Sequence, residues 1–158
     1  MTTAAPTMSQ EVNTFEEYTL YSLEQSTPGL LRLMERSKQV ATFWPGVLAL
    51  TEAASVCQEL AALACYQGTL TDVFRIQDCE GELGEKWQRM QRKMEIVMDN
   101  MDDVLNLNDA GATRKLFGEA LPDALNLFLD LIPLVSEHIR ADYPLAEIGT
   151  DDPSIPGM

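Results

Sequence analysis

The side chains of this chain with the clearest potential for chemistry are four methionines at helical spacing: Met90, Met94, Met98 and Met101. Thioether sulfurs are soft ligands that could hold Cu(I). The methionines also belong to a continuous apolar stripe, together with Trp87, of the kind that core packing requires. Three interpretations therefore stay open: core packing, which is the ordinary one, a methionine-rich groove that docks a partner, and a copper site.

Nucleophilic catalysis needs a general base, and the only histidine of the chain is His138. It falls on the apolar side of the last predicted helix, where a histidine is ordinarily a hydrogen-bonded core residue rather than a catalyst. A pairing with Cys57, Cys65 or Cys79 stays open, although no sequence motif supports it. Cys57 lies in the middle of an apolar helix side, so we expect an inert core thiol there. We expect no enzymatic activity.

Metal and phosphate chemistry also lack their motifs. A di-iron bundle uses Glu-x-x-His pairs that face inward, and the sequence contains none. Residues 99–109, "DNMDDVLNLND", are acidic but lack the central glycine and closing glutamate of a calcium loop. Neither a glycine-rich phosphate loop nor a GxSxG or HExxH motif occurs. We therefore expect no metal and no cofactor.

A basic group interrupts the acidic sequence beside the methionine stripe. It comprises Lys86, Arg89, Arg92 and Lys93. Its ordinary role would be internal pairing with Glu82, Glu85 and Glu95 at helical spacings. Binding of a specific acidic partner is the alternative.

A second candidate contact point is the pair Phe43 and Trp44, at the start of a predicted helix. Aromatic rings are ordinarily buried in such positions. Exposure of one ring would instead provide an anchor for a partner. With the stripe and the basic group, this pair completes the predicted partner-binding set: Trp87, Met90, Met94, Met98, Met101, Arg89, Lys93, Phe43 and Trp44.

Helices must position all of these residues, because apolar periodicity near 3.6 runs along the chain and no convincing period-two strand occurs. The sequence predicts an all-α fold: a single-domain bundle of about four main helices plus short ones over residues 13–143. Residues 1–12 and 144–158 are expected to be flexible tails.

Helix boundaries follow from caps, prolines and glycines. Thr14 and Glu17 form a capping box for a short first helix, and Thr27 with Pro28 starts the second. The third is predicted from Pro45 to Gly68, followed by a short helix and a loop that ends at Gly84. The expected inner side of the helix from Pro45 to Gly68 comprises Val47, Leu50, Ala53, Ala54, Val56, Cys57, Leu60, Ala61 and Ala64.

The second half of the chain is predicted to contain the clearest helix, around Lys86–Leu105, and two more. A short helix over 110–118 can be capped by Asn108 or Asp109. The last helix starts at Pro122 and is apolar on most sides, so it is either central to the bundle or half covered by a second subunit. A homodimer therefore stays open.

Charge narrows the class of partner. The chain has 25 acidic and 11 basic residues in 158, a formal net charge of -14. Such a surface repels nucleic-acid phosphates and anionic lipids, so we expect neither as a direct partner.

An odd number of cysteines and the absence of a signal-peptide pattern indicate a reduced, cytoplasmic protein. We expect no membrane span, because Glu52 and Glu59 interrupt one apolar segment and Asp123 and Asp130 the other.

Three functional hypotheses follow. The first is a small acidic chaperone or adaptor that masks an apolar or basic segment of a partner protein. The second is a regulator that blocks a nucleic-acid-binding protein by DNA-like charge, using Glu95, Asp99, Asp102 and Asp103. The third is a bundle that binds a cofactor or a metal.

Overall fold

The computed structural model describes residues 17–107 and 109–142, and all regular structure in these ranges is helical, which confirms the all-α prediction. The chain divides into two compact units. Thr27–Leu131 form one unit, and the segments up to Ser26 and from Ile132 onward form the other. The predicted tails, residues 1–12 and 144–158, lie outside the described residues.

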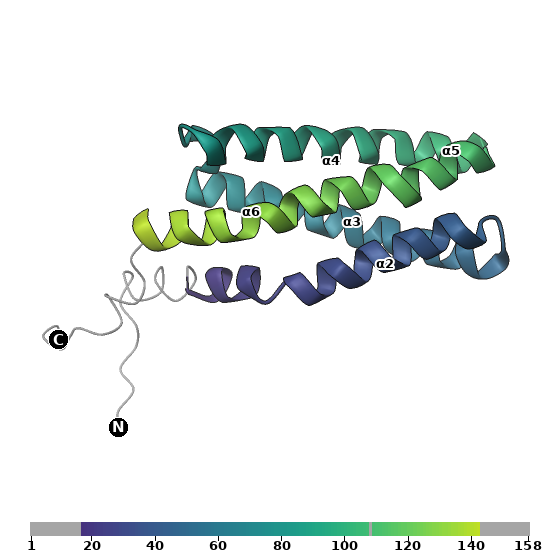
Figure 1. Ribbon diagram of the computed structural model, residues 1–158, viewed down its shortest axis with the longest axis horizontal. Coiled ribbons are helices and arrows are strands. Elements are labelled where there is room, and N and C mark those ends of the chain that lie inside the picture. The colour runs from purple at the N-terminus through teal and green to yellow at the C-terminus, as the bar shows by residue number, and fades with distance from the viewer. Residues whose placement is uncertain (1–16, 108, 143–158) are drawn as a thin grey trace, which may run out of the picture. The chain divides into compact units, whose positions relative to one another are not determined.

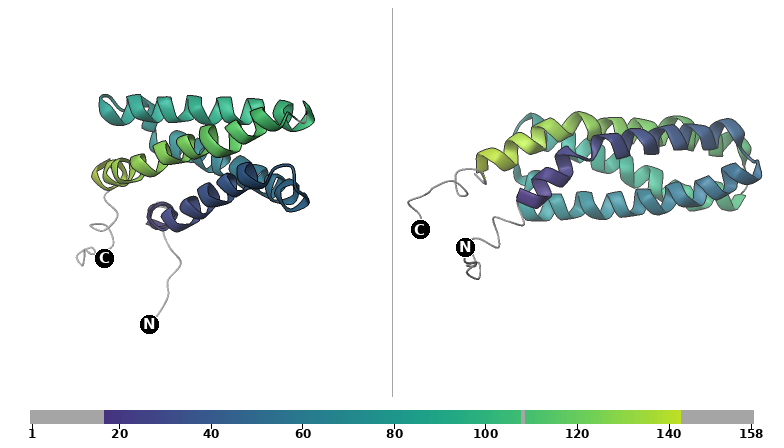
Figure 2. Two further views of the ribbon diagram at one scale, coloured as in Figure 1. Left: turned by 45° about the vertical axis from the view of Figure 1, so that its right-hand side comes forward. Right: turned by 90° about the horizontal axis from the view of Figure 1, so that it is seen from below.

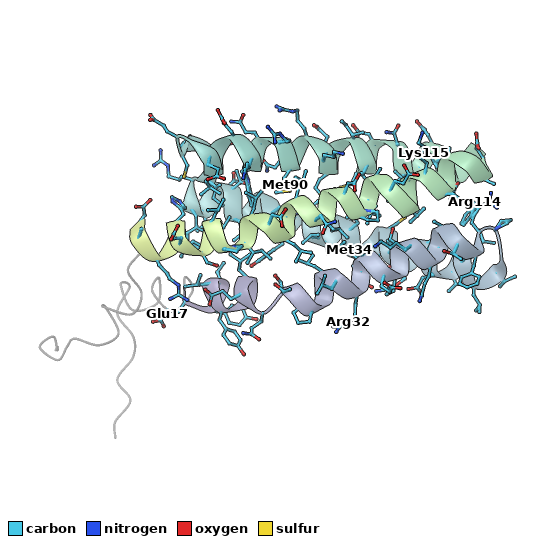
Figure 3. All side chains as sticks on the ribbon, viewed as in Figure 1. Glu17, Arg32, Met34, Met90, Arg114 and Lys115 are labelled. Carbon is cyan, nitrogen blue, oxygen red and sulfur yellow. The ribbon has the colours of Figure 1, made fainter. Side chains whose placement is uncertain are left out.

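Helix α2, Thr27–Phe43, begins at the predicted cap. Proline at the second position fixes a helical φ where no intrahelical N–H bond is needed. One face is buried, and Figure 3 shows Met34 pointing inward while Arg32 points away from the helices. The apolar face packs against α3, which follows after a sharp turn (Figures 1 and 2).

Helix α3, Val47–Phe74, is longer than predicted. The expected stop at Gly68 is wrong, because the helix continues to Phe74 and is capped by Arg75, which takes a left-handed conformation with φ 53°. A glycine inside a helix costs only about 1 kcal/mol. The residues after it, Leu70 and Phe74, are fully buried on the continuing inner face, which more than offsets that cost.

The inner face of α3 also differs from the predicted one. Val47, Leu50, Ala54 and Ala61 are exposed, whereas the helix buries Ala49, Ala53, Val56, Leu60, Gln67, Leu70, Thr71 and Phe74. The helix is apolar nearly all round, so periodicity alone could not define which side faces the core.

A short connection joins α3 to α4. It contains the 3-10 turn η1, Ile76–Asp78, and α4 then extends over Glu82–Leu107. The predicted loop end at Gly84 is wrong, since Gly84 lies inside the first turn of α4. A Cβ at this position would lie 2.0 Å from the carbonyl oxygen of Cys79, so only glycine fits there.

The helix α5, Ala110–Lys115, is capped by Asp109, one of the two candidates, whose side chain accepts a hydrogen bond from the backbone N–H of Ala112. It continues through a π-helical turn, η2, Leu116–Ala120, into α6, Leu121–Asp142. The buried Ser37 hydroxyl of α2 donates to the carbonyl oxygen of Phe117 in this turn. This bond fixes α2 against η2.

The second unit contains a helix over residues 17–24 and the end of α6. Arg140 donates to the Glu24 carboxylate over 2.7 Å, which joins its two segments. His138 Nδ1 lies 3.1 Å from the carboxylate of Asp142. The predicted cap at Thr14 lies outside the described residues.

Candidate functional site

Most of the methionine stripe is core. Trp87, Met90, Met94 and Met101 are at most 5% exposed. The indole N–H of Trp87 donates to Thr71 Oγ1 over 2.9 Å, and its ring meets Phe128 edge to face at a centroid distance of 5.9 Å. The stripe therefore joins α4 to α3 and α6. In this conformation these four side chains offer no docking surface, and only Met98 is half-exposed.

The basic group beside the stripe is exposed and mostly unpaired. Lys86 pairs with Glu82 over 2.5 Å, as predicted. The predicted pairing is wrong for the remaining three cations, Arg89, Arg92 and Lys93, which form no ion pair with any described residue. These cations remain accessible to a ligand.

The turn between α2 and α3 separates the two predicted aromatic residues. Trp44 is 4% exposed, and its carbonyl oxygen accepts a hydrogen bond of 3.1 Å from Arg114. Phe43 is 65% exposed. Of the two alternatives for this aromatic pair, the structure therefore shows the one in which a ring, that of Phe43, stays exposed.

Phe43 adjoins an apolar groove of about 710 Å³. Among the large apolar side chains that line it, Val47 and Leu48 are the most exposed, at 78% and 83%. The residues that line it are Gln39, Val40, Phe43, Gly46, Val47, Leu48, Ala49, Thr51 and Glu52. We refer to the exposed side chains Phe43, Val47, Leu48 and Leu50 as the corner patch.

Two carboxylates of α3 are held against α2 by one cation. Arg36 donates to Glu52, to Glu59 over 2.5 Å and to the Ser55 hydroxyl over 2.7 Å. The hydrogen bonds to Glu52 and Glu59 raise the pKa of the Arg36 guanidinium above its usual value. Apart from these paired carboxylates, much of the outward side of α3 is apolar or small: Val47, Leu48, Leu50, Ala54, Ala61, Ala62 and Cys65 are exposed.

This composition bears on the expectation that the chain has no membrane span, which stays a prediction. Among the described helices, α3 alone is long and apolar enough to cross a membrane, judged by length and composition, despite Glu52 and Glu59. Of its most apolar window, 22% is buried. Core helices of soluble proteins meet the same criteria, so this is weak evidence for a span.

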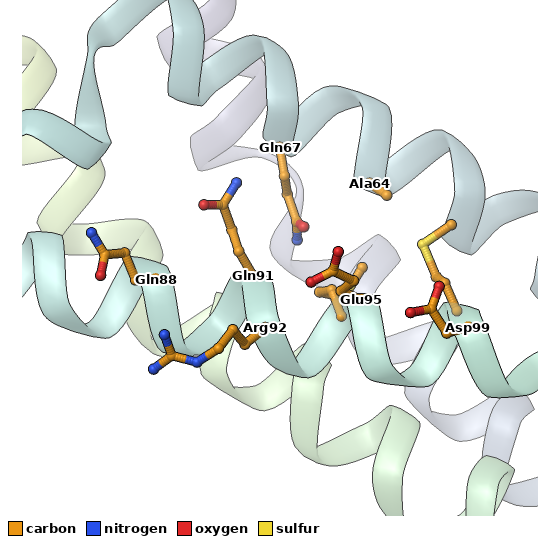
Figure 4. Close-up of a pocket in the computed structure, with 9 residues that line it drawn as sticks. Ala64, Gln67, Gln88, Gln91, Arg92, Glu95 and Asp99 are labelled. Carbon is orange, nitrogen blue, oxygen red and sulfur yellow. The ribbon is translucent and has the colours of Figure 1, made fainter.

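A second cleft, of about 580 Å³, lies between α3 and α4 (Figure 4). Gln67 extends from α3 towards α4, and Gln91, Glu95 and Asp99 extend from α4. Met94 and Met98 also line this cleft, so the half-exposed part of the methionine stripe faces it. The full lining is Ala64, Gln67, Gln88, Gln91, Arg92, Met94, Glu95, Met98 and Asp99.

Four carboxylates lie along α4, the first two in the lining of this cleft and the other two beyond it. Glu95, Asp99, Asp102 and Asp103 are exposed, and none pairs with a described lysine or arginine. This is the acidic array that the second functional hypothesis requires.

Groups suited to catalysis do not converge in the described part of the chain. Burial, and secondarily the Asp102 carboxylate, raises the pKa of the Cys57 thiol to about 11, so this thiol is neutral near pH 7. Among the described residues no three metal-binding side chains of His, Cys, Asp or Glu lie together. His138 contacts Asp142, and both residues belong to the unit that includes the chain from Ile132 onward.

Sequence reasoning missed several residues of the two clefts, above all Leu48, Gln67 and Gln91. A signal existed for Gln67, because it follows Leu60 by seven residues and precedes Thr71 by four, which places a polar amide on the inner face. No comparable signal marks Leu48. Comparisons with protein-family models, curated proteins and solved structures find no match to this chain.

Proposed function

We propose that this chain is a non-catalytic protein-binding module, a chaperone or adaptor that masks an apolar segment of a partner protein at the corner patch. One observation carries the proposal: Val47 and Leu48 are 78% and 83% exposed beside Phe43, in an apolar groove. Contiguous exposed apolar surface of this kind marks interaction sites in soluble proteins.

The energetics favour a partner with an apolar anchor. Complete burial of a large apolar side chain stabilises a complex by about 1.5–3 kcal/mol. Phe43, Val47 and Leu48 together could therefore supply a useful affinity after the entropic cost of association. An amphipathic helix that lays its apolar face into the groove is the simplest occupant.

The charge of the chain adds selectivity. A net charge of -14 repels other acidic proteins and attracts basic flanks of a partner segment. The corner patch itself is uncharged, so apolar contact decides binding there and the surrounding charge decides which partner approaches.

A partner pull-down with matched variants tests the proposal. Tagged wild type, the double variant Val47→Ser/Leu48→Ser and the control Ile96→Ser are compared in nuclease-treated native lysate by quantitative mass spectrometry. Ile96 is a suitable control because it is 58% exposed on α4, outside the corner patch. We expect a protein that survives washing at high salt with wild type and control but is lost with the double variant.

Two outcomes would contradict the proposal. Equal recovery of every protein with the double variant would show that the corner patch binds nothing. A doubled mass of the wild type in light scattering, abolished by Val47→Ser/Leu48→Ser, would show that a second copy of the chain covers the patch instead.

The second candidate is the regulator that imitates nucleic acid, which the unpaired array Glu95, Asp99, Asp102 and Asp103 favours. Its partner would be a nucleic-acid-binding protein released by salt, because exposed charge pairs are screened. Recovery of such a protein, lost with Asp102→Asn/Asp103→Asn and retained with Val47→Ser/Leu48→Ser, would favour this function over the first.

A further inference from the structure

The cleft between α3 and α4 contains a buried polar group that finds no partner among the described residues. Gln67 is 2% exposed, and its amide nitrogen, Nε2, has no hydrogen-bond acceptor in residues 17–107 or 109–142. A buried donor without an acceptor destabilises the folded protein, so most buried polar groups are satisfied. Figure 4 shows this amide pointing towards α4 between Gln91 and Glu95, into the cleft.

Gln91 supplies a complementary group on the opposite wall. Its amide nitrogen donates to Thr71 Oγ1 over 3.1 Å, and no described residue donates to its carbonyl oxygen. Gln67 and Gln91 thus present one donor and one acceptor to the cleft. A peptide group, which has one carbonyl and one N–H, matches this pair.

The rest of the lining changes in character along α4. Ala64, Met94 and Met98 form its apolar part, and the exposed carboxylates of Glu95 and Asp99 follow Gln91 along the helix. Gln88 and the Arg92 guanidinium lie on the other side of Gln91 from Asp99 (Figure 4), so this cation is away from the carboxylate end of the cleft. The positions of Glu95 and Asp99, four and eight residues after Gln91, place them progressively farther along the helix. An alkyl stem with a cationic head fits a cleft that has apolar side chains followed by carboxylates, because long basic side chains pack their methylenes on apolar atoms.

We propose that the α3–α4 cleft binds a basic segment of a polypeptide in an extended conformation, through one lysine or arginine. The peptide group before or after that residue pairs with Gln67 and Gln91. Its methylenes pack on Met94 and Met98, and its cationic head reaches Glu95 and Asp99. This inference deepens the proposed function, since it assigns the basic part of the partner to a second site.

Nuclear magnetic resonance on the ¹⁵N-labelled full chain tests the site directly. The probes are Ac-Ala-Ala-Arg-Ala-Ala-NH2 and the same peptide with citrulline, which is neutral and nearly isosteric with arginine. We expect saturable shifts of the Gln67 side-chain amide signals with the arginine peptide, and binding at least about tenfold weaker with citrulline. Unshifted Gln67 signals, or equal affinity for both peptides, would overturn the proposal.

Agmatine separates a polypeptide ligand from a small cation. It has the stem and head of arginine without a peptide group, so it cannot satisfy Gln67. We expect it to bind at least about tenfold more weakly than the arginine peptide, since the buried donor is then left unpaired. Equal affinity would show that the cleft takes a simple cation and that the peptide group has no role.

Gln67→Met distinguishes a binding role from a structural one. The substitution removes the unsatisfied amide at similar volume, so we expect the Tm to rise by about 2–4 °C. Binding of the arginine peptide should weaken at least about tenfold in the same variant. Gln58→Met, an exposed change on the same helix, is the control and should alter neither property. Unchanged peptide affinity in Gln67→Met would overturn the assignment.

Matched charge variants test the cationic end. Glu95→Gln/Asp99→Asn should weaken the arginine peptide at least about tenfold, whereas Asp102→Asn/Asp103→Asn removes the same charge outside the lining and should leave it nearly unchanged. Equal losses of peptide affinity in the two double variants would show that the carboxylates act only by long-range attraction, which would overturn the assignment of the cationic head to Glu95 and Asp99. Val47→Ser/Leu48→Ser should bind this peptide normally, so the cleft and the corner patch can fail independently.

Discussion

Helices α3 and α4 have nearly the same length, 28 and 26 residues, but distribute their side chains differently. In α4 the apolar residues Trp87, Met90, Met94, Val97 and Met101 are buried, while most charged residues face outward. In α3 the buried face is also mostly apolar, with Gln67 and Thr71 as its polar members, yet the exposed side keeps Val47, Leu48 and Leu50.

This difference distinguishes apolar residues that the folded core needs from apolar residues that it does not need. The pattern of α4 is explained by core packing, because each large apolar side chain except Ile96 is at least partly withdrawn from solvent where it is described. The outward valine and two leucines of α3 contribute little to the core. A partner that covers them would explain their presence, so variants that separate stability from binding test this contrast most directly.

The largest effect is expected at the buried face of α4. Trp87→Ala should lower the free energy of unfolding by about 3–5 kcal/mol, because it leaves a large cavity beside Phe128 and removes the bond to Thr71. Urea denaturation followed by circular dichroism measures this value. Gln88→Ala, on the exposed side, should change it by less than about 0.5 kcal/mol. Similar small losses in both variants would contradict the assignment of the stripe to the core.

A smaller effect is expected at the polar contact between the two helices. Thr71→Val keeps the volume but leaves the Trp87 N–H without its acceptor, which should cost about 1–3 kcal/mol in the free energy of unfolding. Thr69→Val serves as the control, because that hydroxyl is exposed and bonds only to the backbone of its own helix. A cost for Thr71→Val no greater than for Thr69→Val would show that the buried bond is dispensable.

Cysteine alkylation compares two sides of α3 in the wild type. Cys65 is exposed, whereas burial raises the pKa of the Cys57 thiol to about 11. Only the thiolate reacts, so at pH 8 iodoacetamide should modify Cys57 at least about tenfold more slowly than Cys65. Below that pKa, the Cys57 rate should rise about tenfold per pH unit as the thiolate fraction grows. Peptide mass spectrometry separates the sites, and equal rates at pH 8 would contradict the burial of Cys57.

The smallest effect on stability is expected at the corner patch. Leu48→Ala should change the free energy of unfolding by less than about 0.5 kcal/mol, because this side chain is 83% exposed. Leu60→Ala on the same helix removes a fully buried side chain and should cost about 2–5 kcal/mol. Denaturation of both variants provides the comparison. A large loss for Leu48→Ala would assign Leu48 to the core and remove the basis for the corner patch.

The same contrast explains how much of the fold the sequence could predict. Local signals place the start of α2 at Thr27, where the helix begins. For the α4 stripe and for the cap of α5 the sequence left alternatives, and the structure buries most of the stripe and uses Asp109 as the cap. The inner face of α3 was predicted wrongly, because an apolar residue on every side carries no directional information. The π-helical turn has no recognisable local signal either.

The candidate sites were harder to predict than the fold. Exposure of Phe43 was one of two alternatives for the aromatic pair, and the structure selects it. The α3–α4 cleft depends on the distance between two helices, which no spacing within one helix defines. Gln67 could have been noticed as a polar residue on an inner face, but its lack of an acceptor is a property of the packed structure.

The π-helical turn η2 has a consequence for insertions and deletions in this chain. Its five residues, Leu116–Ala120, hold one residue more than an ordinary helical turn would need. Deleting one of them would convert this wide turn into an ordinary one and would leave the flanking residues, such as buried Leu121 and Leu125, on their present faces. Deleting a residue from the regular part of α6 would instead rotate everything after it by about 100°. The loss of one residue should therefore be tolerated better in this turn than in the regular helix that follows it.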